Sequence, residues 1–168
     1  MEDHAEFVES HLTPDRRILW PPESQDQATL GRTMLGISFV RTMDYWIDLA
    51  VDYVTNPGDD KVFERKNEAW KRDRAYRSAF AQLTAEQRTM VLKLVRQVAH
   101  GVLFSTMVDV DQFPPANVHI ALVERDEDEQ IARSVEIYAG NGDLHDELCD
   151  WVARFSKHAE QLDADVMT

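Results

Sequence analysis

Apolar residues recur at steps of three and four along much of the chain, which is the spacing of one face of an α-helix. The longest such run predicts a helix over residues 27–54, ended by the sequence Asn-Pro-Gly at positions 56–58. Its apolar stripe consists of Leu30, Met34, Ile37, Val40, Met43, Ile47, Val51 and Val54. Because other apolar side chains widen this stripe, we expect the helix to be central, with Gly31 and Gly36 marking close contacts.

Two more long helices are predicted after this one. A basic helix is predicted over residues 60–83, and the next helix begins after Thr84, which forms a capping box with Gln87. This third helix continues to about Val108. Its second half carries apolar residues around most of its circumference, so we expect that half to be well buried. Gly101 lies within it and marks another expected close contact.

The pattern then changes from a helical period to alternation, which is typical of a half-buried strand. Residues 118–124 and 131–138 alternate around a polar turn, and together they predict a β-hairpin. Since a lone hairpin is marginal in water, its apolar face must lie on the helices. A final helix is predicted over residues 144–162, with Asp143 as its cap. The whole pattern predicts an α+β fold, predominantly helical, in which about four helices pack with a β-hairpin in the C-terminal half.

The length of 168 residues is usual for one domain, so we expect a single domain over residues 1–168. Residues 1–26 are predicted to form an N-terminal arm with a short helix, and Trp20 within it should pack onto the domain. Residues 163–168 are predicted to be a frayed tail, as chain ends usually are.

The chemistry of the chain is typical of a cytoplasmic protein. Its only cysteine, Cys149, has no partner for an internal disulfide, and its acidic start lacks the basic and apolar regions of a secretory signal. Apolar stretches fall short of the roughly 20 residues that cross a bilayer. We therefore expect a cytoplasmic location and no membrane association.

The charge of the chain is large and unevenly distributed, and this bears on its possible partners. The net charge is −13, and residues 124–150 hold ten acids against two arginines, whereas residues 61–77 hold seven bases against three acids. The overall sign repels nucleic acid and attracts a basic protein. The basic helix is best explained as a solvated, salt-bridged face, although it is also able to dock on an acidic patch of another copy, giving a homodimer.

Nine carboxylates are the candidate partner-binding residues, because charged loops on a rigid scaffold commonly hold a partner. They are Glu124, Asp126, Glu127, Asp128, Glu129, Glu136, Asp143, Asp146 and Glu147. Two simpler explanations stand beside this one. The acids maintain solubility, or they protect an exposed sheet edge from aggregation.

The sequence indicates catalytic chemistry less strongly than it indicates partner binding. Asp109 and Asp111, if their loop meets the start of the last helix, would lie near His145 and Asp146 and form a carboxylate-rich cation site. The spacing of these residues matches no known calcium loop or zinc-binding pair. No nucleophile lies in a recognised catalytic motif, so we expect no catalytic residues, metal or cofactor.

These observations favour a non-catalytic inhibitor of the bacterial immunity type, which neutralises a basic toxin or enzyme through an acidic surface. Two alternatives remain open. One is a small metal-dependent or hydrolytic enzyme that uses Asp109, Asp111, His145 and Asp146. The other is an acidic mimic of nucleic acid that blocks a DNA-binding protein.

Overall fold

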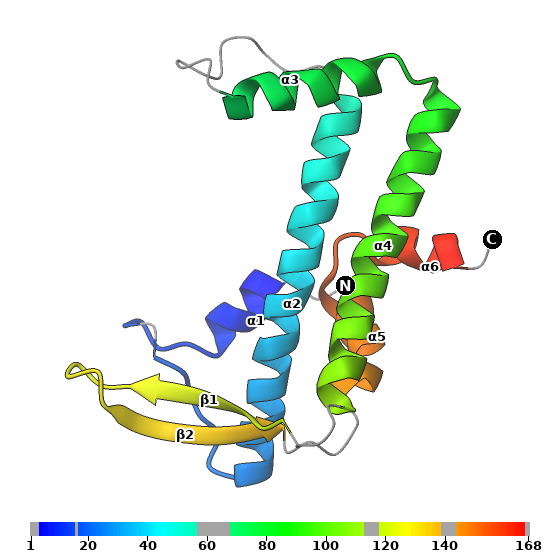
Figure 1. Ribbon diagram of the computed structural model, residues 1–168. Helices are drawn as coiled ribbons and strands as arrows, with labels where there is room; N and C mark the ends of the chain where they lie inside the picture. Colours follow the sequence, from blue (N-terminus) through cyan, green and yellow to red (C-terminus); the bar gives the residue numbers. More distant parts are fainter. Residues whose placement is uncertain (1–3, 16, 57–67, 113–117, 139–143, 167–168) are drawn as a thin grey trace.

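The computed structural model describes residues 4–15, 17–56, 68–112, 118–138 and 144–166. These residues form a mostly helical α+β fold with a two-stranded antiparallel hairpin in the C-terminal half, which confirms the predicted fold class (Figure 1). The helices are α1 (His4–Ser10), α2 (Ser24–Thr55), α3 (Glu68–Ala81), α4 (Ala85–Asp111), α5 (Leu144–Phe155) and α6 (Ala159–Val166). The strands are β1 (Ile120–Arg125) and β2 (Ile131–Tyr138).

Helix α2 is central, as its wide apolar stripe predicts. It packs against α3, α4, α5 and β2. Most of the predicted stripe is buried, namely Leu30, Ile37, Val40, Met43, Ile47 and Val54. Figure 1 shows α2 and α4 side by side, with α3 across one end of the pair and the hairpin and α5 toward the other end. The molecule therefore has one end formed by α3 and another formed by the hairpin and α5, and a pair of long helices joins the two ends.

Arg77 links helix α3 to α2. Residues 60–67, the first part of the predicted basic helix, lie outside the described residues. Within the described part, Arg77 donates from Nη2 to Asp52 Oδ2 at 2.5 Å and from Nε to Asp73 Oδ2 at 3.0 Å. Its guanidinium also lies over the Tyr53 ring. These contacts fix α3 across the end of α2.

The predicted close contacts at Gly31 and Gly36 are confirmed, and they join α2 to the C-terminal half. A Cβ on Gly31 would overlap the Ile137 side chain of β2, and one on Gly36 would overlap the buried Trp151 ring of α5. At Gly101 a Cβ would meet nothing within 4 Å. The expected close contact at Gly101 is therefore absent from the described structure.

The predicted helix over residues 144–162 is interrupted, so α5 and α6 are separate helices. The cause is Asp44 of α2, which is buried at the interruption. One carboxylate oxygen of Asp44 accepts the Ser156 hydroxyl at 2.6 Å, and the other accepts the backbone N–H of Lys157 at 3.1 Å. These bonds satisfy polar groups that a continuous helix would bond differently.

Helix α6 continues to Val166, into the segment for which the sequence predicts a frayed tail over residues 163–168. Leu162 is buried in the core, and Asp165 accepts a hydrogen bond from Nε of Arg96 on α4 at 2.7 Å. Both side chains of this ion pair are nearly buried. Contacts with α4 therefore position this part of the chain, and residues 167–168 of the predicted tail lie outside the described residues.

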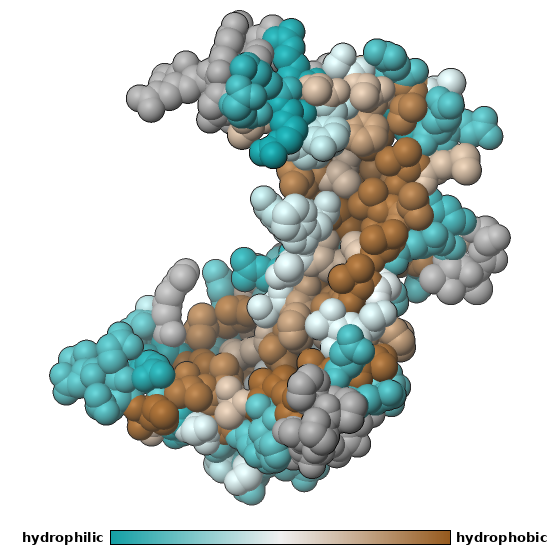
Figure 2. All heavy atoms as spheres, viewed as in Figure 1, coloured by the Kyte–Doolittle hydropathy of each residue, from teal (hydrophilic) through white to brown (hydrophobic). Residues whose placement is uncertain are grey.

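The expected burial of the second half of α4 is wrong. Met107 is the one fully buried residue of this helix, whereas its exposed large apolar residues are Met90, Leu94, Val98, Val102 and Phe104. Helix α4 packs against α2, α5 and α6. Apolar residues of α4 also lie on the part of its surface outside these contacts. Figure 2 shows them as an apolar band along the helix.

Candidate functional site

The structure describes eight of the nine candidate carboxylates, with four in the hairpin turn, two on the strands and two at the start of α5. Asp143 lies outside the described residues. The acids at 126–129 form the turn between β1 and β2, whereas Asp146 and Glu147 lie in the first turn of α5. Because Ile120 pairs with Tyr138 at the opposite end of the hairpin, the strands separate the two groups (Figure 1). Among the described residues, the acids of the turn and those of α5 therefore lie at opposite ends of the hairpin.

Two of the candidates on the strands have partners within the molecule. Glu124 of β1 accepts the indole N–H of Trp20 at 3.0 Å, and Glu136 of β2 lies 3.0 Å from Nδ1 of His119. The Arg133 guanidinium lies over the Trp20 ring. Trp20 therefore packs onto the domain, as predicted, and it holds the N-terminal arm against the hairpin.

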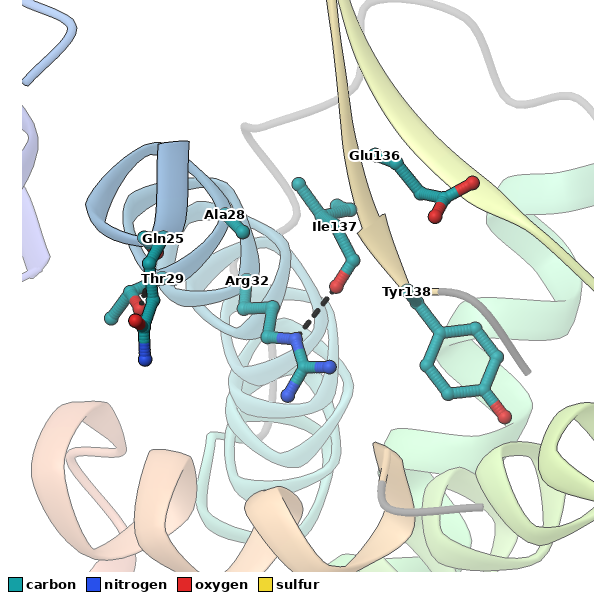
Figure 3. Close-up of a pocket in the computed structure, with 7 residues that line it drawn as sticks. All are labelled: Gln25, Ala28, Thr29, Arg32, Glu136, Ile137 and Tyr138. Carbon is teal, nitrogen blue, oxygen red and sulfur yellow. Dashed lines mark hydrogen bonds between the residues drawn. The ribbon is translucent and has the colours of Figure 1, made fainter. Parts of the chain in front are cut away.

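Glu147 contributes to the attachment of the hairpin to α2. Arg32 of α2 donates from Nε to the Ile137 carbonyl at 2.6 Å and from Nη1 to Glu147 at 2.5 Å. Figure 3 shows this arginine reaching from α2 to the end of β2, along a pocket of about 280 Å³, while the Glu136 carboxylate points away from it. Arg32 thus joins three elements, and the Glu147 carboxylate is used inside the molecule.

The acids of the hairpin turn, residues 126–129, are held in a defined conformation. The Asp126 carboxylate accepts the backbone N–H groups of Asp128 at 3.0 Å and Gln130 at 2.9 Å. Glu129 adopts a left-handed φ of 61°, and its carbonyl accepts a hydrogen bond from Arg125 at 2.7 Å. We refer to residues 126–129 as the acidic turn.

The carboxylates of the acidic turn are exposed. The Glu127 side chain is 94% exposed, and Arg17, which is also exposed, lies 3.8 Å from its carboxylate. Exposed ion pairs at such distances contribute little. The acidic turn therefore presents negative charge on a fixed backbone, at the projecting end of a hairpin that Arg32 and Trp20 attach to the domain.

The candidate cation site has a structural role in this fold. The side chain of Asp111, at the end of α4, is inaccessible to solvent. It accepts the hydroxyl of Tyr138 and the backbone N–H groups of Leu144 and His145, the latter two at 3.2 and 2.9 Å. It also bonds with the Nδ1 of His145. The carboxylate thus caps the N-terminus of α5, whose first N–H groups have no partner within the helix.

These bonds determine the charge of Asp111. Burial by itself raises the pKa of this carboxyl group, but the hydrogen bonds from Tyr138, His145 and the backbone outweigh burial and lower the pKa below its usual value of 3.8. Asp111 is therefore an anion that holds α4, β2 and α5 together.

The other members of the expected cation site are arranged less closely. Asp146 is exposed, with Oδ1 3.4 Å from Nε2 of His145, and Asp109 is exposed on α4. Within the described ranges, no group of three His, Cys, Asp or Glu side chains is placed to hold a metal ion.

An apolar groove between α2 and α4 is the surface that the sequence prediction missed. The groove has a volume of about 630 Å³. It is lined by Phe39, Thr42, Met43, Trp46, Leu94, Val95, Val98, Ala99, Val102, Leu103 and Thr106. By length and composition alone, α4 is the one helix in the described part of the chain that is long and apolar enough to cross a membrane.

A signal for this groove is present in the sequence. Leu94, Val98 and Val102 recur at steps of four along the helix whose second half the sequence predicts to be buried. Trp46, one of the apolar side chains that widen the stripe of the central helix, is 57% exposed. Comparison with known proteins finds no family model, curated protein or solved structure that matches this chain.

Proposed function

We propose that this chain is a non-catalytic inhibitor of the immunity type, which binds a basic toxin or enzyme through the acidic turn. The observation that carries the proposal is the fixed, exposed conformation of residues 126–129 at the projecting end of the hairpin. A surface that is already ordered loses little conformational entropy on binding. Its concentrated charge also accelerates encounter with a basic partner.

The structure narrows the proposed contact within the nine candidate residues. Glu124 and Glu147 accept hydrogen bonds from Trp20 and Arg32 in partly buried contacts, so their carboxylates are engaged within the molecule. Glu136 forms an exposed pair with His119, away from the turn. A partner is therefore proposed to contact Glu127, Asp128 and Glu129, with Asp126 supporting the turn.

Capture from the source cells tests the proposed contact. The tagged wild-type chain is compared with the variant Glu127→Gln, Asp128→Asn and Glu129→Gln, which removes three charges and keeps the Asp126 bonds. We expect the wild type to retain a protein of net positive charge and the variant to retain at least about tenfold less of it, because charge complementarity is lost. The captured proteins are identified and quantified by mass spectrometry.

A matched control removes the same charge elsewhere. Glu86, Glu160 and Asp163 are exposed acids on α4 and α6, and their replacement by Gln, Gln and Asn should leave capture unchanged. Equal capture by all three forms, or capture of acidic proteins alone, would contradict the proposed function.

A further inference from the structure

The apolar groove joins an exposed apolar stripe that runs along α4. Val98 is 53% exposed and Val102 62%, and Trp46 of α2 extends the same surface. Monomeric proteins rarely expose a continuous apolar patch of more than a few hundred Å². We propose that this face is the interface of a homodimer, in which the α2–α4 pair of a second copy packs against it in antiparallel orientation.

The apolar face is large enough to mark an interaction site. Its exposed positions on α4 extend from Met90 to Phe104, which is about 21 Å along the helix axis. Two adjacent helices, each about 10 Å wide, then present roughly 400 Å², and a patch of this size on a protein surface is often functional.

The position of the apolar stripe suits a twofold axis. Val98 is the middle residue of α4, and the exposed apolar positions extend from Met90 on one side to Phe104 on the other. A second copy that is related by a twofold axis perpendicular to α4 at Val98 therefore places its apolar stripe against the stripe of the first copy. Gly101 lies one helical turn from Val98, and the open space at its Cβ position allows close approach of a partner helix.

Charge selects the antiparallel orientation. Helix α3 carries the exposed bases Lys71, Arg72 and Arg74, whereas the acidic turn lies toward the other end of the molecule. In Figure 1, α3 and the hairpin project from the same side of the α2–α4 pair. A parallel dimer would place both basic helices at one end and both acidic hairpins at the other, so that neither charge would face its opposite. An antiparallel dimer instead places each α3 near the acidic end of its partner.

This inference is independent of the proposed function, because its interface consists of apolar groove residues and the proposed toxin contact consists of the acidic turn. A chain that dimerises but captures no basic protein would support the dimer and contradict the proposed function. A monomer that captures a basic protein through the acidic turn would support the proposed function and contradict the dimer.

Light scattering during size-exclusion chromatography tests the dimer. The wild type should have about twice the 19.4 kDa mass of the chain. Val98→Glu places two carboxylates together at the twofold axis, so its dissociation constant should rise at least about 100-fold and its mass should fall to that of one chain. Ile131→Glu, at a β2 position that is 61% exposed, makes the same chemical change outside the groove and should remain dimeric.

Circular dichroism checks that each variant is folded, and Val102→Glu replaces Val98→Glu if that variant does not fold. A wild type with the mass of one chain would overturn the proposal. Equal masses for the wild type and folded groove variants would also overturn it. A single-chain wild type that sediments with phosphatidylcholine vesicles would show instead that the face binds a lipid surface.

Cross-linking tests the orientation in a Cys149→Ser background with a short bifunctional thiol reagent. In the antiparallel dimer α4 faces α4, so Val98→Cys should link two copies. Met90→Cys should not link, because the two positions would be about 24 Å apart along the helix axes. Efficient linking through Met90→Cys, or failure of Val98→Cys to link a confirmed dimer, would overturn the antiparallel arrangement.

Discussion

Replacement of Gly36 by alanine is expected to destabilise the protein by about 2–3 kcal/mol, because overpacking a filled core forces side chains and backbone to shift. The added methyl group would overlap the ring of Trp151, which is buried between α2 and α5. Alanine favours a helix by up to about 1 kcal/mol over glycine, so the overlap must exceed this gain. Urea unfolding at fixed chain concentration measures the net change.

Ser38→Ala is the matched control for this substitution. Ser38 is exposed on the same helix two residues away, and its replacement should change the free energy of unfolding by no more than about 0.5 kcal/mol. A Gly36→Ala variant as stable as the wild type would show that α2 and α5 are not packed as closely as described.

Replacement of Asp111 by alanine should lower the free energy of unfolding by about 3 kcal/mol. The loss leaves the Tyr138 hydroxyl and the first N–H groups of α5 without their acceptor, and buried donors without partners are costly. Asp109→Ala removes an exposed carboxylate from the same helix end and should cost far less. Comparable losses in the two variants would contradict the capping role of Asp111.

The same residue predicts a dependence on pH. Because folding lowers the pKa of Asp111, its contribution to stability is complete above the unfolded value, near 3.8, and is lost as pH falls toward the folded pKa. The wild type should therefore lose stability on acidification below this value, and Asp111→Ala should show a shallower dependence there. Urea unfolding at several acidic pH values measures both slopes.

Local features of this fold could be predicted from the sequence. The Thr84 hydroxyl accepts the Gln87 N–H at 3.2 Å, and Gln87 accepts the Thr84 N–H at 2.9 Å, which confirms the capping box. Strand alternation likewise predicts the hairpin, with Val135 and Ile137 buried. Both signals arise from interactions between residues close in sequence.

Features that depend on distant residues could not be predicted. The interruption between α5 and α6 depends on Asp44, more than a hundred positions earlier, and Asp111 caps a helix that begins over thirty residues later. No local spacing reveals such pairs. The α4 stripe shows a further limit, because periodicity at residues such as Leu94 and Val98 identifies an apolar face without showing whether another element covers it.

Neutralisation of the captured basic protein tests the proposed inhibitory function most directly. Its toxicity on expression in cells, or its enzymatic activity once identified, is measured alone, with the wild-type chain in equimolar amount, and with the variant Glu127→Gln, Asp128→Asn and Glu129→Gln. We expect the wild type to abolish the activity of the partner and the variant to leave most of that activity intact. A partner that stays fully active in complex with the wild-type chain would contradict an inhibitory, immunity-type function.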